Sequence, residues 1–137
     1  MAVDMNMPIL IVDDQSTMLR IGRNLLEQLG FEKIDTALDG PTALRKARAT
    51  KFGLIISDWN MEPMTGLEFL KEVRADPALE STPFIMATAE AETENAVMAK
   101  EAGANAYVVK PINAEILKKK IAEAIGEFRP PNGRSRI

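Results

Sequence analysis

The sequence contains no cysteine and no histidine. The absence of cysteine excludes disulfides, thiolate chemistry and metal centres built on thiolates. The absence of histidine excludes a serine–histidine triad, a histidine-based zinc centre and a phosphohistidine carrier. Any metal site or reactive group in this chain must therefore be built from oxygen ligands and lysine.

The chain also lacks a long apolar run and an excess of positive charge. No segment approaches the roughly 20 apolar residues of a membrane span, and the first eight residues carry Asp4 instead of the basic and apolar regions of a signal peptide. The net charge is −3 and the pI is near 5.1, so there is no electrostatic footprint for nucleic acid. We therefore expect a cytoplasmic protein that neither inserts into a membrane nor binds nucleic acid.

Short apolar runs alternate with segments of helical spacing along the 137 residues. The runs, each read as a buried strand, are 9–12, 34–37, 54–57, 84–87 and 106–109. Helices are expected after an N-cap at Ser16 with a stop at Gly30, after Asp39, over 66–75, over 93–102 with a stop at Gly103, and from Asn113. This alternation predicts an α/β fold, with a doubly wound five-stranded parallel sheet and helices on both faces. We expect one domain over residues 1–128 and a flexible tail containing proline and arginine over residues 129–137.

Reactive polar groups follow four of the five predicted strands. Asp13 and Asp14 follow the first, Asp58 the third, Thr88 the fourth and Lys110 the fifth. The carboxyl ends of parallel strands share one edge of a doubly wound sheet, which is where ligands bind. Standing alone, the first two aspartates could merely favour the start of the next helix. Together, the five residues predict a functional site at that edge.

Clustered carboxylates need a counter-charge, because two of them about 4 Å apart repel by roughly 4 kcal/mol at an effective dielectric of about 20. Mg²⁺ is the expected cofactor, since it binds oxygen ligands and readily bridges to phosphoryl groups. A carboxylate nucleophile, a metal, a lysine and a hydroxyl together predict phosphoryl transfer. We interpret Asp58 as the nucleophile that becomes an aspartyl phosphate.

The motifs resemble those of the receiver domains of two-component response regulators, and within that family the single-domain chemotaxis regulators. The resemblance covers residues 7–128, and the matching stretches are 9–14, 16–20, 23–26, 56–61, 66–70, 88–90 and 106–111. It implies the strand order 2-1-3-4-5. It also implies that Asp58 is phosphorylated by a histidine kinase, while Asp13, Asp14, Asp58 and the backbone carbonyl of Asn60 arrange Mg²⁺.

The resemblance further implies how the phosphorylated state is held and released. Thr88 and Lys110 would bind the phosphoryl oxygens, and Tyr107 would be the switch residue that moves with Thr88. On sequence grounds alone, Tyr107 in an apolar strand would be a core residue. Asn60 and Glu90 match positions that tune dephosphorylation, and their identities imply a short-lived phosphorylated state.

The implied output is binding to another protein, with no enzymatic activity beyond the chain's own phosphorylation and dephosphorylation. We expect a monomer that binds the flagellar motor switch through the surface of the fourth helix, fifth strand and fifth helix. A phosphate sink or an adaptor in another pathway is the alternative within the family. A Mg²⁺-dependent phosphatase and a cyclic-dinucleotide effector that uses Arg129, Arg134 and Arg136 are less favoured. The phosphatase would need a second aspartate two residues after Asp58, where the sequence has Asn60.

The sequence departs from the family pattern beside the predicted site. Glu62-Pro63 follows Met61, where the family pattern places proline directly after the methionine. The loop length is kept, so Asp58 is expected to be unaffected, while the conformation of Glu62-Pro63 is left open. Gln15 also replaces a more usual residue beside the acidic pair, which could alter solvent access.

Overall fold

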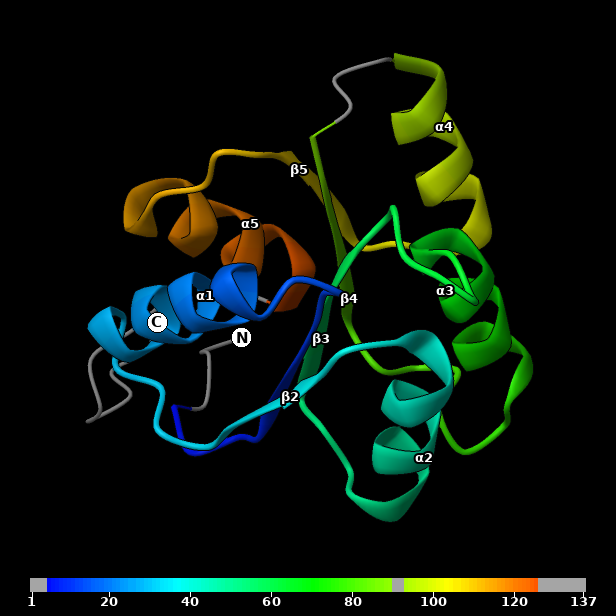
Figure 1. Ribbon diagram of the computed structural model, residues 1–137, viewed down its shortest axis with the longest axis horizontal. Coiled ribbons are helices and arrows are strands. Elements are labelled where there is room, and N and C mark those ends of the chain that lie inside the picture. The colour runs from blue at the N-terminus through cyan, green and yellow to red at the C-terminus, as the bar shows by residue number, and fades with distance from the viewer. Residues whose placement is uncertain (1–4, 90–92, 126–137) are drawn as a thin grey trace, which may run out of the picture.

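The computed structural model describes residues 5–89 and 93–125, in which strands and helices alternate along the chain (Figure 1). The elements are β1 (Ile9–Val12), α1 (Ser16–Gln28), β2 (Ile34–Ala37), α2 (Gly40–Ala49), β3 (Leu54–Asp58), α3 (Gly66–Ala75), β4 (Phe84–Thr88), α4 (Thr93–Ala102), β5 (Ala106–Val109) and α5 (Ala114–Ile125). The strands pair in parallel in the order β2-β1-β3-β4-β5, which confirms the predicted fold class. Within the described ranges no helix is long and apolar enough to cross a membrane.

Side-chain alternation along the strands divides the core into two layers. In β3, Leu54 and Ile56 pack with buried residues of α1 and α5, whereas Ile55 packs with buried residues of α2, α3 and α4. Successive residues of a strand point to opposite faces. A strand that is apolar at every position is therefore buried on both sides. Figure 1 shows the resulting arrangement, with α1 and α5 on one side of the sheet and α2, α3 and α4 on the other.

Side-chain caps fix the first turns of α2 and α3. Oδ1 of Asp39 accepts a hydrogen bond from the amide of Thr42 at 2.7 Å. Thr65 and Glu68 form a reciprocal capping box, with distances of 2.9 and 3.1 Å. Because such caps satisfy amides that have no partner inside the helix, the start of α3 has a defined position next to the end of β3.

Two predicted helix starts differ from the structure by one residue. Ser16 is the first residue of α1 and not its N-cap; Gln15 caps the helix, without a capping hydrogen bond from its side chain. The carboxylate of Asp13 instead accepts the amide of Gln15 at 3.0 Å. Asn113, expected to begin the last helix, is its cap and accepts the amide of Ile116 at 2.8 Å.

Arg74 joins α3 to the segments on either side of β4. Its guanidinium donates to the carbonyl of Gly103 at 3.0 and 2.9 Å, and to the carbonyls of Glu80 and Thr82 at 3.0 and 2.7 Å. It also donates to Oδ1 of Asn105 at 3.0 Å. One half-buried side chain thus holds the α3–β4 connection and the end of α4 together.

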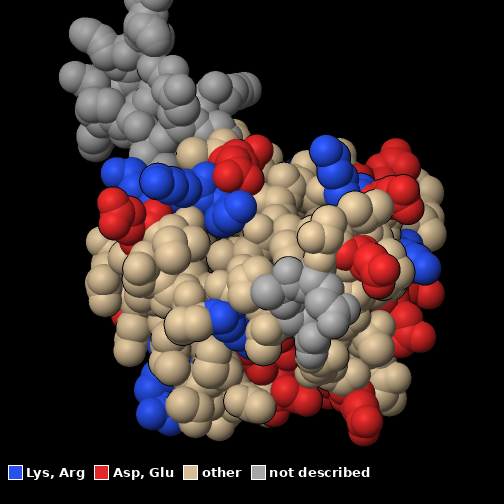
Figure 2. Space-filling view, turned by 90° about the horizontal axis from the view of Figure 1, so that it is seen from above, with Lys and Arg blue, Asp and Glu red and all other residues tan. Residues whose placement is uncertain are grey.

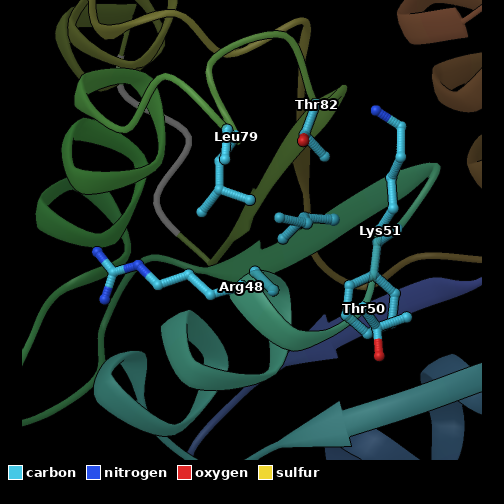
Figure 3. Close-up of a pocket in the computed structure, with 9 residues that line it drawn as sticks. Arg48, Thr50, Lys51, Leu79 and Thr82 are labelled. Atoms are coloured by element: carbon cyan, nitrogen blue, oxygen red, sulfur yellow. The ribbon is translucent and has the colours of Figure 1, made fainter.

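A cavity of about 190 Å³ lies at the amino edge of the sheet, between α2 and the α3–β4 connection. Its residues are Ala47, Arg48, Thr50, Lys51, Phe52, Ile55, Ala78, Leu79 and Thr82. Figure 3 shows the guanidinium of Arg48 extending away from the other labelled side chains, and its Nε pairs with Oδ2 of Asp76 at 3.0 Å. The cavity lies at the edge opposite the strand ends that carry the predicted site.

Candidate functional site at the carboxyl edge of the sheet

Three aspartates gather where β1 and β3 end. Val12 is in register with Ser57, so Asp13 and Asp58 leave neighbouring strands side by side. One carboxylate oxygen from each of Asp13, Asp14 and Asp58 lies within 4.8 Å of the others. Asp13 and Asp58 are buried, and Asp14 is exposed. Figure 2 looks onto this end of the molecule and shows acidic side chains gathered there, with basic side chains beside them.

Lys110 is the counter-charge of this cluster. Its Nζ donates to Oδ2 of Asp13 at 2.9 Å and to Oδ1 of Asp58 at 3.0 Å. The amide of Lys110 donates to the carbonyl of Thr88 at 2.8 Å, which continues the β4–β5 pairing by one residue. Hydrogen bonds between charged groups are about twice as strong as neutral ones. The fold therefore brings together four of the residues that sequence analysis placed at this edge.

Burial and neighbouring charges shift the pKa values of Asp58 and Lys110. Burial raises the pKa of the Asp58 carboxyl above its ordinary value, and the hydrogen bond and charge of Lys110 offset only part of that rise. Burial acts to lower the pKa of Lys110, but its hydrogen bonds to Asp13 and Asp58 outweigh this and leave that pKa raised. The lysine therefore remains charged at neutral pH, and the Asp58 carboxylate has an environment that further positive charge would stabilise.

Thr88 lies at the same edge, and Tyr107 lies further back on the neighbouring strand, in register with Met86 of β4. Asp58 is in register with Ala87, so Thr88 lies one residue further along β4, where it is fully buried. Tyr107 is half-buried and packs on the core layer of α2, α3 and α4. Its ring meets that of Trp59 edge to face, with centroids 6.4 Å apart and planes at 86°. The residue after Asp58 is thus in direct contact with the predicted switch residue.

The loop after β3 borders the acidic cluster. Asn60 is exposed two residues beyond Asp58. Glu62 and Pro63, the departure noted above, are exposed, joined by a cis peptide bond, and line a shallow hollow together with Asp14 and Asn60. Glu90 and the predicted tail over 129–137 lie outside the described residues.

Two residues that no sequence motif singled out contact the backbone at Asp58 and Trp59. The hydroxyl of Ser57 donates to the carbonyl of Asp58 at 2.9 Å. Gly66 is buried, and its amide donates to the carbonyl of Trp59 at 2.8 Å. A serine within an apolar strand could have signalled the first contact. Nothing in the sequence distinguished Gly66 from a glycine that only begins a helix.

The three aspartates form a donor set that fits Mg²⁺. All three offer hard oxygen ligands, two of them buried and one exposed toward solvent. Mg²⁺ prefers a few carboxylates and keeps several waters, and an exposed ligand such as Asp14 leaves room for those waters. Among the described residues, Asp13, Asp14 and Asp58 are the acidic groups that could hold the ion, while the carbonyl of Asn60 as a further ligand stays a prediction.

Comparison with known proteins identifies the class that this fold and site define. The response regulator receiver domain family matches residues 9–122. The chemotaxis protein CheY of Pseudomonas aeruginosa is 50% identical over 115 residues, which cover 84% of this chain and 93% of that protein. CheY-3 of Vibrio cholerae is 49% identical over 116 residues, covering 85% of this chain and 89% of that protein. This chain belongs to the response regulator receiver domain family.

Solved structures agree with this assignment. The chemotaxis response regulator CheY4 of Vibrio cholerae has a TM-score of 0.81 at 38% identity, covering 88% of this chain and 99% of that one. The receiver domain of the sensor histidine kinase PA1611 of Pseudomonas aeruginosa has a TM-score of 0.79 at 26% identity, covering 88% and 98%. That structure is described with a magnesium ion coordinated in its active site cleft. The comparisons confirm the family predicted from the motifs.

Proposed function

We propose that this chain is a phosphorylation-dependent switch in which Asp58 accepts a phosphoryl group from a histidine kinase. The observation that carries the proposal is the Lys110 ammonium, which bridges the carboxylates of Asp13 and Asp58 at 2.9 and 3.0 Å beside exposed Asp14. Membership of the receiver family and the relatives named CheY support it. A buried carboxylate with a lysine partner and adjacent metal ligands is suited to phosphoryl transfer.

The proposed chemistry is a displacement at phosphorus. An oxygen of Asp58 forms a bond to phosphorus while the bond from phosphorus to the donor's histidine nitrogen breaks, and the electron pair of that bond stays on the nitrogen. Lys110 already contacts Asp58, so its ammonium is placed to pair with a phosphoryl oxygen. The hydroxyl of Thr88 is proposed to donate to another. When bound, Mg²⁺ would neutralise charge on the phosphoryl oxygens.

The output proposed is binding to a protein target through α4, β5 and α5. Phosphorylation adds about −1.5 to −2 charges at the carboxyl edge, a change that Thr88 and Tyr107 are proposed to relay. Exposed large apolar residues support this surface: of the six among the described residues, four lie on it, Val97 and Met98 on α4, Val109 on β5 and Ile116 on α5, while Ile21 and Leu38 lie elsewhere. Because a binding surface needs exposed apolar side chains that a partner can cover, we assign the target to this face. The names of the relatives favour chemotaxis, and within chemotaxis we propose the flagellar motor switch as the target.

Mass spectrometry tests the phosphoacceptor. Incubation with a small acyl phosphate and Mg²⁺ is expected to add one phosphoryl group, and Asp58→Ala is expected to abolish the gain. Omission of Mg²⁺ should greatly slow the reaction. A mass gain that survives Asp58→Ala, or no gain in the unmodified chain, would disprove the assignment.

A pull-down with a motor-switch peptide tests the output. Binding should be stronger with beryllofluoride, which mimics the phosphoryl group, than without it. Equal binding in the two states, or none, would favour the phosphate sink or adaptor.

We further propose that the chain acts in the cytoplasm as a monomer. It is also proposed not to hydrolyse external phosphoesters. Steady hydrolysis of a phosphoester at a high rate would instead support the phosphatase. Sedimentation with and without beryllofluoride would check the monomer.

A further inference from the structure

Gly66 is packed directly against the backbone of the proposed phosphoacceptor. A Cβ atom built on Gly66 would overlap the carbonyl oxygen of Asp58, and would lie 2.9 Å from the carbonyl carbon of Asp58 and from Cα of Trp59. Real Cβ atoms essentially never approach heavy atoms closer than 3.0 Å. All three neighbours are main-chain atoms, so no change of rotamer can relieve the overlap.

Space, and not backbone conformation, is what requires a glycine here. In the described residues the glycines with positive φ are Gly30 and Gly103, at 107° and 111°. Gly66 is not among them, so a residue with a side chain could adopt its backbone angles. The missing Cβ therefore serves the close approach of α3 to the end of β3.

Both sides of this contact are held in place. On one side, the amide of Gly66 donates to the carbonyl of Trp59 at 2.8 Å and closes the loop that carries Asn60. On the other, the capping box of Thr65 and Glu68 fixes the first turn of α3. Buried residues further along α3 set the position of the helix against the sheet. A side chain at Gly66 must therefore move the backbone at Asp58 or displace the start of α3.

We propose that Gly66 is a positioning residue for phosphoryl transfer: by having no side chain, it lets the first turn of α3 hold the backbone of Asp58 where its carboxylate meets Lys110. This inference rests on the proposed function of Asp58. The carboxylate oxygen lies 3.0 Å from Nζ of Lys110, so a shift of the backbone would lengthen that contact. Misplacement by about 1 Å can slow a reaction by about 100-fold.

The test compares Gly66→Ala with Gly53→Ala. A Cβ on Gly53 would also be crowded, with Met7 Sδ at 2.6 Å, but its neighbours are atoms of one side chain just before β1, at the opposite edge of the sheet. The phosphorylation rate constant at saturating small phosphodonor is measured for folded protein. It should fall at least tenfold in Gly66→Ala and stay within about twofold in Gly53→Ala. Equal rates in the two variants would overturn the proposal.

A second readout separates this inference from the proposed function. The NMR signal of the Lys110 ammonium, protected by its hydrogen bonds to Asp13 and Asp58, should be lost or shifted in Gly66→Ala and kept in Gly53→Ala. This signal does not depend on phosphorylation. If the unmodified chain takes no phosphoryl group, the proposed function fails, while the signal still tests the positioning. An unchanged signal in Gly66→Ala would overturn the positioning role.

Folding of Gly66→Ala is checked first by circular dichroism. If the variant is unfolded in buffer, all three proteins are measured in trimethylamine N-oxide, which favours compact states. A variant that remains unfolded there would overturn the proposal, because Gly66 would then be required for the fold itself.

Discussion

The ammonium of Lys110 lies 3.0 Å from Oδ1 of Asp58, although 52 residues separate the two along the chain. The same ammonium reaches Asp13 at 2.9 Å. Two buried carboxylates that would repel each other thus share one cation. The charges of the site partly neutralise one another. Removing one of them should therefore change the stability of the fold or the affinity for Mg²⁺.

Replacing Lys110 with methionine removes the counter-charge while keeping the apolar stem. We expect the free energy of unfolding at neutral pH without Mg²⁺ to fall by about 1–3 kcal/mol, because buried carboxylates lose a charged partner. The pKa of Lys110 is raised from 10.5, so its stabilising effect is fully present below that pH and is lost as pH rises through the raised value. Urea denaturation measures the change. Lys71→Met, at an exposed lysine of α3, should stay within about 0.5 kcal/mol and serves as the control.

Asp14 should affect metal binding more than stability. It is exposed, whereas the buried Asp13 is held by Lys110. We expect Asp14→Asn to weaken Mg²⁺ binding about tenfold or more, with no loss of stability without metal, since removing one of three like charges reduces repulsion. Asp13→Asn should change both properties. Titration of Trp59 fluorescence with Mg²⁺, together with urea denaturation, measures the two effects. Unchanged Mg²⁺ affinity in Asp14→Asn would contradict the assigned ligand.

The cap of α2 should give a pH-dependent contribution to stability. Hydrogen bonding from Thr42 lowers the pKa of Asp39 below 3.8. Because the folded-state pKa is depressed, the carboxylate stabilises the fold above 3.8 and loses this effect as pH falls through the lowered value. At neutral pH, Asp39→Ala should cost about 1 kcal/mol, and Asp39→Asn much less because its amide oxygen also caps. Urea denaturation at several pH values measures the effect. As the pH falls, the difference in the free energy of unfolding between Asp39→Asn and the unmodified chain should shrink.

Arg74 and Arg48 should differ sharply in their contribution to stability. Arg74 donates five hydrogen bonds from a half-buried position, three of them to the carbonyls of Gly103 and Thr82. Arg48 makes one ion pair with Asp76, and its side chain is 52% exposed. We expect Arg74→Met to cost about 2–4 kcal/mol and Arg48→Met less than about 1 kcal/mol. Urea denaturation of both variants provides the comparison. Equal losses in the free energy of unfolding would show that Arg74 stabilises the fold no more than an exposed ion pair does.

Local patterns predicted the elements well because each depends on neighbouring residues. The apolar run 54–57 predicted β3, and the glycines expected to stop the first and fourth helices, Gly30 and Gly103, follow α1 and α4 and have positive φ. The errors lie at helix starts, where competition among nearby polar groups decides the cap. Ser16 had the right side chain, but it is already the first residue of α1 and Gln15 is the cap. The strand order came from the family resemblance, because periodicity does not say which strands are neighbours.

The sequence by itself limited the chemistry to oxygen and lysine, since it has no histidine or cysteine, and placed Asp13, Asp14, Asp58, Thr88 and Lys110 at strand ends. Only the tertiary structure decided how those residues meet. It buries Asp13 and Asp58, pairs both with the ammonium of Lys110 and leaves Asp14 exposed. It also packs the ring of Trp59 against that of Tyr107. It also gives Gly66 a reason to lack a side chain. Such contacts join segments far apart in the chain, and their distances are set by the packing of helices against the sheet.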